Sequence, residues 1–121
     1  MIILVTKINY KISGDEFRSL SYKVAEELND PEMYKWKIWA VDEKNSTGLT
    51  VYCLDDEAQA DKVTDYLNTM GLIYSSILHN ISIEKYEILE EPTRLNFGPI
   101  GSPEDFSDQL DTEQGSINNT I

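Results

Sequence analysis

The sequence predicts an α+β domain in which two helices pack on one face of a four-stranded antiparallel sheet. Three observations favour this class. Four segments rich in β-branched and aromatic residues are typical of strands, and two segments with apolar residues at helical spacing are typical of helices. Their order along the chain is β-α-β-β-α-β, the ferredoxin-like arrangement. A length of 121 residues suits one domain of this kind.

The first half of the motif begins with Ile2 to Tyr10, which is apolar on both strand faces, as expected of a strand buried on both sides. A helix should follow, because Ser13 and Glu16 have the spacing of a capping box. The "NDP" that follows ends this helix, and residues 34–41, "YKWKIWAV", form the second strand. The apolar residues at helical spacing are Phe17, Leu20, Val24, Ala25 and Leu28.

The second half repeats the pattern after a polar hairpin loop, "DEKNSTG". Residues 49–54 form the third strand, and the second helix begins with Asp56 and Gln59 as a cap pair and ends before Gly71. The next segment, "LIYSSILHN", suits either a further helical turn or an ordered loop. Residues 81–89 are the last strand, which "EEP" stops.

The chain is expected to divide into a folded domain, residues 1–97, and an acidic, flexible C-terminal tail, residues 98–121. The tail has five acidic residues, no basic one, two prolines and three glycines, a composition that buries little surface. We therefore expect the tail to be dispensable for the fold. The alternative is a short helix that begins at Ser102 and docks through Phe106 and Leu110.

Charge and cysteine content exclude several classes of protein. The net charge of −12 argues against nucleic acid and against an anionic membrane surface as partners. Cys53 is the only cysteine, so no intramolecular disulfide can form, and no residues have the spacing of a metal site. The apolar N-terminus lacks the basic region of a secretion signal. We expect a cytoplasmic protein that binds no metal.

Four motifs suggest a family. They are "GDEF" (14–17), "WKIWAVDE" (36–43), "GLTVYCLDDEAQA" (48–60) and "YEILEEP" (86–92). In their order and spacing the chain resembles the YdhR-type mono-oxygenase family of the dimeric α+β barrel superfamily, over about residues 2–92. Two features depart from the family pattern, namely Thr6 in place of a histidine on the first strand, and the acidic tail.

The resemblance implies a homodimer in which the sheets of two copies pack together, with a pocket between sheet and helices in each copy. It also implies oxidation of small phenolic or quinol substrates by O₂ with no cofactor. The functional hypothesis is a cofactor-independent mono-oxygenase acting on a small aromatic. The alternative is a non-catalytic dimeric protein of the same fold that binds a small ligand or a partner.

Two tryptophans on the second strand pose the question of which residues face the pocket. Strand alternation sends Trp36 and Trp39 to opposite faces. We expect the more apolar row to face the helices and the other row to face the partner sheet. The first row is Tyr34, Trp36, Ile38 and Ala40, and the second is Lys35, Lys37, Trp39 and Val41. Large residues on both faces of a small body predict an obligate homodimer.

His79 is the only histidine and is therefore the predicted general base, since its ordinary pKa lies near neutrality. Trp36 is the second predicted catalytic residue, as a wall of the pocket. The predicted substrate-binding residues are Tyr34, Ile38, Tyr52, Tyr66 and Phe17. The alternatives are a partly exposed loop histidine, a tryptophan in a simple core, and tyrosines that only pack.

Overall fold

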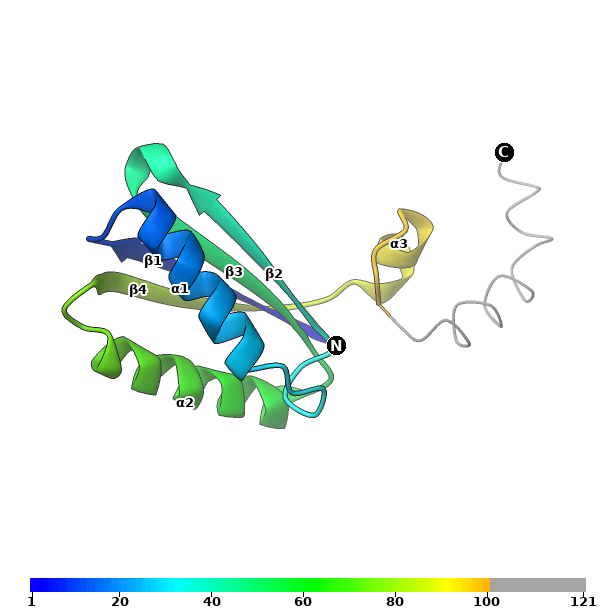
Figure 1. Cartoon of the computed structure of the whole chain (residues 1–121). Helices are drawn as coiled ribbons and strands as arrows, with labels where there is room; N and C mark the ends of the chain where they lie inside the picture. Colours follow the sequence, from blue (N-terminus) through cyan, green and yellow to red (C-terminus); the bar gives the residue numbers. More distant parts are fainter. Residues whose placement is uncertain (101–121) are drawn as a thin grey trace. The chain divides into compact units, whose positions relative to one another are not determined.

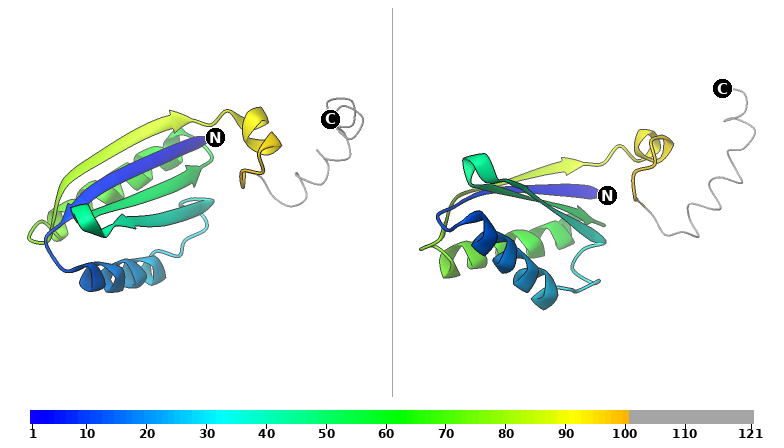
Figure 2. Two further views of the ribbon diagram at one scale, coloured as in Figure 1. Left: turned by 90° about the horizontal axis from the view of Figure 1, so that it is seen from above. Right: turned by 45° about the horizontal axis from the view of Figure 1, so that its top comes forward.

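The computed structural model describes residues 1–100, and these residues contain the predicted β-α-β-β-α-β order (Figure 1). The strands form one antiparallel sheet with the order β2-β3-β1-β4. The two long helices lie on the same face of this sheet (Figure 2). The predicted ferredoxin-like class is thus confirmed. The elements are β1 (Ile2–Tyr10), α1 (Gly14–Glu27), β2 (Trp36–Asp42), β3 (Thr47–Leu54), α2 (Glu57–Ile73) and β4 (Leu78–Glu87), with the 3₁₀ turn η1 (Glu43–Asn45) and a short third helix, α3 (Glu90–Leu95).

Both long helices begin where the capping residues predict. The hydroxyl of Ser13 accepts a hydrogen bond from the backbone N–H of Glu16 at 3.1 Å, and the Glu16 carboxylate accepts one from the N–H of Ser13 at 3.3 Å. The carboxylate of Asp56 accepts a hydrogen bond from the N–H of Gln59 at 2.9 Å. These bonds satisfy backbone donors that the first helical turn leaves free.

The second helix and the last strand have bounds that differ from the prediction. Gly71 lies inside α2, which continues to Ile73, and β4 begins at Leu78. The segment between them is thus part helix, part turn and part strand, and His79 belongs to a strand and not to a loop. The last strand ends at Glu87, before Pro92. Pro92 lies in the first turn of α3, where a proline costs no helical hydrogen bond.

The chain divides into two compact units, of which the first spans residues 1–88 and the second begins at Leu89. In the second unit, Thr93 Oγ1 donates a hydrogen bond to the carbonyl oxygen of Leu89 at 2.6 Å. The domain boundary expected at residue 97 falls inside this unit. The helix considered at Ser102, with Phe106 and Leu110, lies outside the described residues. None of the helices described is both long enough and apolar enough to cross a bilayer.

The core of the first unit lies between the sheet and the two helices. Its central residue is Tyr52 on β3, whose side chain is fully buried. Near the start of α1, the ring of Phe17 stacks on that of Tyr10 with the centroids 4.3 Å apart. The buried core cluster is Ile2, Leu4, Tyr52, Leu54, Ala60 and Val63.

The strand register decides which side of β2 faces the helices. Lys37 is paired with Tyr52, and Trp39 is paired with Thr50. Directly paired residues share a sheet face, so Lys37 and Trp39 face the helices together with Tyr52. Trp36 and Ile38 therefore lie on the outer face, and the predicted assignment of faces is wrong. Alternation indicates which residues share a face, but the more apolar row is not always the row that faces the helices.

Candidate functional site

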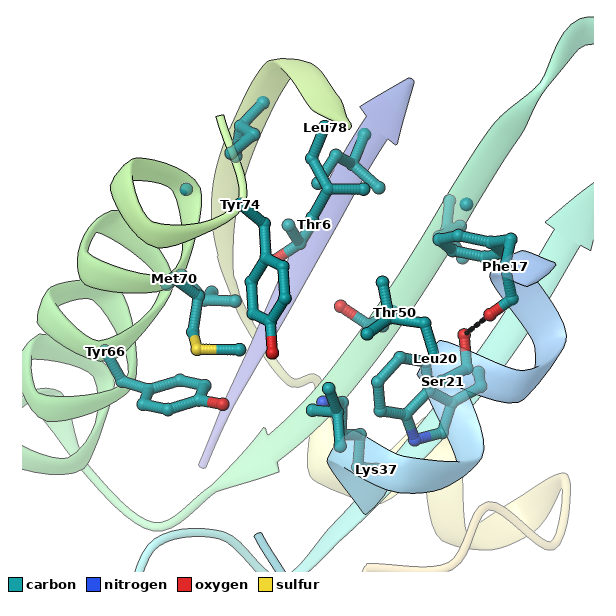
Figure 3. Close-up of a pocket in the computed structure, with 18 of the residues that line it drawn as sticks. Thr6, Phe17, Leu20, Ser21, Lys37, Thr50, Tyr66, Met70, Tyr74 and Leu78 are labelled. Carbon is teal, nitrogen blue, oxygen red and sulfur yellow. Dashed lines mark hydrogen bonds between the residues drawn. The ribbon is translucent and has the colours of Figure 1, made fainter. Parts of the chain in front are cut away.

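A pocket with a volume of about 90 Å³ lies between the sheet and helices α1 and α2. Its floor is formed by β1, β2 and β3, and its walls come from both helices and from the start of β4. Figure 3 shows Tyr66 and Tyr74 reaching into it from the α2 side, and Lys37 and Thr50 from the strands. The residues around it are Thr6, Ile8, Phe17, Leu20, Ser21, Val24, Lys37, Trp39, Gly48, Leu49, Thr50, Tyr52, Tyr66, Leu67, Met70, Gly71, Tyr74, Leu78 and Ile81.

Two glycines allow the elements around the pocket to approach closely. A Cβ atom at Gly48 would lie 2.4 Å from Cζ of Phe17, so the absence of a side chain on β3 makes room for that ring. A Cβ atom at Gly71 would lie 2.6 Å from Cδ1 of Ile81, so the end of α2 can pack directly against β4. At Gly48 the rigid Phe17 ring makes glycine a steric requirement, whereas at Gly71 a Cβ atom would require the end of the Ile81 side chain to move.

Lys37 is the only basic residue that lines the pocket. Its Nζ lies 3.7 Å from the centroid of the Trp39 ring and 4.6 Å from that of the Tyr52 ring. It forms none of the ion pairs within residues 1–100. Burial lowers the pKa of Lys37 to about 7, because the apolar surroundings disfavour the charged amine. At physiological pH, a substantial fraction of the protein molecules therefore carries Lys37 as the neutral amine.

The hydroxyl groups of the pocket are protonated donors. Burial raises the pKa of Tyr66 to about 12 and that of Tyr52 beyond this range. The hydroxyls of Thr6, Thr50 and Tyr52 are buried and none makes a well-formed hydrogen bond within the described part of the chain, although the Thr50 hydroxyl lies near enough to that of Tyr52 to moderate the rise in its pKa. Thr6 itself is only 4% exposed. Since an unpaired buried hydroxyl is costly, these groups are suited to bind a ligand oxygen.

Three of the predicted substrate-binding residues meet at this pocket, namely Phe17, Tyr52 and Tyr66. Tyr34 lies just before β2 and packs against the core, its ring edge-on to that of Tyr52 with the centroids 5.7 Å apart. Its hydroxyl donates a hydrogen bond to the carbonyl oxygen of Leu28. Tyr34 thus supports the pocket from behind and is not part of its lining.

The other predicted site residues lie elsewhere. Trp36 and Ile38 are on the outer face of the sheet, as the register of β2 shows. His79 is paired with Asn9, which alternates on β1 with the pocket residue Ile8, so this pairing puts His79 on the outer face. The strand is irregular beside it, at Asn80 with its positive φ of 52°, which is why Leu78 and Ile81 can both line the pocket. Its Nδ1 is buried without a hydrogen-bond partner among the described residues. The structure does not bring His79 to the pocket.

Sequence reasoning missed Lys37 and Trp39 as pocket residues. A signal was present, since Lys37 lies between two tryptophans in a largely apolar strand and its parity places it beside Trp39. Thr6 and Thr50 carried no comparable signal, because threonine is common in strands. Within residues 1–100, no three histidine, cysteine, aspartate or glutamate side chains gather in a way that could hold a metal ion.

The fold and its pocket define a ferredoxin-like α+β protein with a ligand-sized, largely apolar site under its helices. The comparison with protein families specifies the group. The chain matches the family described as "Putative mono-oxygenase ydhR" over residues 3–99. The protein therefore belongs to this family, in agreement with the predicted resemblance. The search of curated proteins gave no significant match.

Proposed function

We propose that the protein is a mono-oxygenase that oxidises a small hydroxyaromatic compound with O₂ in the pocket between sheet and helices, without a bound metal or flavin. The observation that carries the proposal is an apolar, aromatic-walled pocket that contains one amine and several unpaired hydroxyls. Membership of the mono-oxygenase family supports the reaction type. The resemblance to the α+β barrel superfamily supports cofactor independence.

The size of the pocket favours a single aromatic ring. Pockets for drug-sized ligands are typically about 300–1,000 Å³, whereas this one has a volume of about 90 Å³. Trp39, Tyr66 and Phe17 offer ring faces and edges for aromatic contacts. Apolar walls also suit O₂, which is itself apolar.

The proposed reaction converts a phenol and O₂ into a quinone and water. The phenol first loses its O–H proton, and the resulting electron-rich anion donates an electron to O₂. The reduced oxygen bonds to a ring carbon as a peroxide. The C–H bond at that carbon and the O–O bond then break, both ring oxygens become C=O groups, and the distal oxygen leaves as water with the protons from the former O–H and C–H groups. The substrate supplies all four electrons, so the balance requires no external reductant. The protein must bind the ring, accept the proton and exclude bulk water.

An oxygen electrode with a panel of phenols and hydroquinones tests this function. We expect sustained O₂ consumption with at least one compound. Ser21→Leu should lower it at least about tenfold, because Ser21 lines the pocket and a larger apolar side chain would occupy the ligand's space. Ser19→Leu is the matched control, since Ser19 is exposed on the same helix. No uptake with any compound, or equal activity in both variants, would contradict the proposal.

A non-catalytic ligand-binding protein of the same fold is the second candidate. It is favoured by the composition of the lining, which contains neither a histidine nor a carboxylate, the side chains that most often transfer protons in enzymes. On this hypothesis, the panel compounds bind to the wild-type protein and not to Ser21→Leu, and no O₂ is consumed.

A further inference from the structure

We propose that Lys37, as a neutral amine, is the proton acceptor of this pocket, and that the pocket selects phenol-type aromatics that it binds as anions with their oxygen at Nζ. The inference deepens the proposed function and rests on it for the oxidation step. Binding and ionisation of the phenol are properties of the pocket itself. They can be measured without turnover.

The first step of the argument is elimination among the lining residues. The residues able to exchange a proton are Lys37, Tyr52, Tyr66 and Tyr74. A tyrosine hydroxyl ordinarily keeps its proton up to about pH 10, and burial raises the pKa of Tyr52 and Tyr66 further. These hydroxyls can therefore donate hydrogen bonds near neutral pH but cannot act as bases. Lys37 is the one side chain of the lining that can accept a proton there.

The second step concerns what faces Lys37 from each neighbouring element. From β3 comes Tyr52, from its own strand Trp39, and from α2 and its end Tyr66 and Tyr74. Helix α1 contributes only uncharged side chains to the lining, which are Phe17, Leu20, Ser21 and Val24. No carboxylate counters the effect of burial, which is the sole cause of the lowered pKa of Lys37. The neutral amine is accordingly well populated.

The third step is the balance of the proton transfer. The phenolic O–H bond breaks and an N–H bond forms at Nζ, which leaves an ammonium beside a phenolate. The ammonium lies against the rings of Trp39 and Tyr52, which attract a cation. The phenolate oxygen supplies the acceptor that the buried hydroxyls of Thr6 and Thr50 lack. A bound phenol oxygen would thus give an acceptor to hydroxyls that have no partner among the described residues, and it would accept more strongly as a phenolate.

Ultraviolet difference spectroscopy with 4-cyanophenol tests the proton transfer directly. The absorption band of this phenol moves to longer wavelength when it ionises. Near pH 7, close to the pKa of Lys37, most of the free phenol is protonated. We expect the wild-type protein to bind it with appearance of the ionised band. Lys37→Met should show at most binding of the un-ionised form, while circular dichroism verifies its fold.

Lys35→Met is the matched control. Lys35 lies just before β2, pairs with Asp55 at 3.0 Å and does not line the pocket, so this variant should retain the ionised band. The inference is overturned if Lys37→Met keeps the band, if the wild-type protein binds the phenol only in un-ionised form, or if it does not bind it at all. An ionised band without O₂ uptake for any panel compound would support Lys37 and contradict the oxygenase function.

Where turnover is found, its pH profile gives a second readout. The base is the unprotonated amine, so kcat/KM should rise with pH through about 7 and then level off. Lys37→Met should lack this limb and lose about 10²–10⁴-fold in kcat/KM, the usual contribution of positioned proton transfer. His79→Ala should keep both the limb and the rate. Full activity in Lys37→Met would exclude the base role even if the oxygenase function holds.

Discussion

At the scale of single residues, Lys37 represents a conflict between stability and function. Its side chain is half-buried in an apolar pocket and forms no ion pair among the described residues. Burial of a charge is tolerated in proteins chiefly where the group does chemistry or binds a ligand. The position of Lys37 is therefore itself an argument for a functional pocket.

The stability of Lys37→Met provides a prediction that does not depend on any activity. The folded protein lowers the pKa of Lys37 from 10.5 to about 7. Between these values the unfolded chain binds more protons, so this residue makes the wild-type protein less stable as pH falls from 10.5 toward 7. Lys37→Met removes that cost. We expect it to raise the free energy of unfolding near pH 7 by on the order of 1–3 kcal/mol.

Urea unfolding of both proteins at about pH 7 and about pH 10 measures this effect. The gain should shrink at the higher pH, because the amine is then neutral in the folded state and the unfolded chain, near its ordinary lysine pKa of 10.5, binds the proton only weakly. Lys35→Met should show no such gain, since Lys35 forms a partly exposed ion pair with Asp55. A loss of stability in Lys37→Met at both pH values would show that the charge is better accommodated than we infer.

Gly48 provides the second prediction at this scale. Alanine in place of a strand glycine ordinarily stabilises by about 0.5–1 kcal/mol, but here its Cβ would lie 2.4 Å from the Phe17 ring. Overpacking of a core costs about 1–3 kcal/mol, so Gly48→Ala should lower the free energy of unfolding. In Gly14→Ala, the control, the Cβ meets only the flexible Glu43 side chain, at 3.1 Å. Thermal unfolding in which both variants equalled the wild type would contradict the packing described.

The site residues were only partly predictable for a physical reason. Alternation correctly grouped Lys37 with Trp39 and Trp36 with Ile38. It could not show which group faces the helices, because both sheet faces carry large apolar residues. The prediction placed the more apolar row of β2, which contains Trp36 and Ile38, on the face that the helices cover. A pocket that needs a polar group reverses this preference, so the deviation coincides with the candidate site, as expected of functional residues.

At the scale of elements, local signals predicted the starts of helices better than their ends. The caps at Ser13 and Asp56 are hydrogen bonds between residues that are close in the sequence, so the sequence specifies them directly. Gly71 carries the signal of a helix end, yet α2 continues past it. Gly71 lets α2 pack closely against Ile81, and this is a tertiary contact that no local pattern reveals. The start of β4 was missed for the same reason.

Gly71→Ala tests this packing. In an exposed helix the change would stabilise by about 1 kcal/mol, but its Cβ would lie 2.6 Å from Cδ1 of Ile81. We expect a net loss of about 0.5–2 kcal/mol, since overpacking outweighs helix propensity. Ile81→Val removes the Cδ1 atom and should recover most of this loss in the double variant. A double-mutant cycle by urea unfolding with no coupling would argue against the close approach of α2 to β4.

At the scale of the whole molecule, the outer face of the sheet remains to be explained. Both long helices lie on the other face (Figure 2). Trp36, Ile38 and Val51 lie on this outer face, with Ile38 50% exposed and Tyr86 of β4 52% exposed. Exposed large apolar side chains on an uncovered sheet face are typical of an interface. The two apolar faces of the sheet were evident in the sequence, and the homodimer inferred from them remains a prediction.

We propose that the outer face of the sheet packs against a second copy, as the family resemblance implies. Light scattering at micromolar concentration should then give the mass of a dimer. Ile38→Glu should produce a monomer. Both copies contribute the same surface to a two-fold interface, so the dimer would have to bury two unpaired carboxylates, one from each copy. Leu72→Glu is the control, since Leu72 is 78% exposed on α2 and lies away from this face. A monomeric wild-type protein, or an Ile38→Glu variant that stays dimeric, would contradict the assignment of this surface.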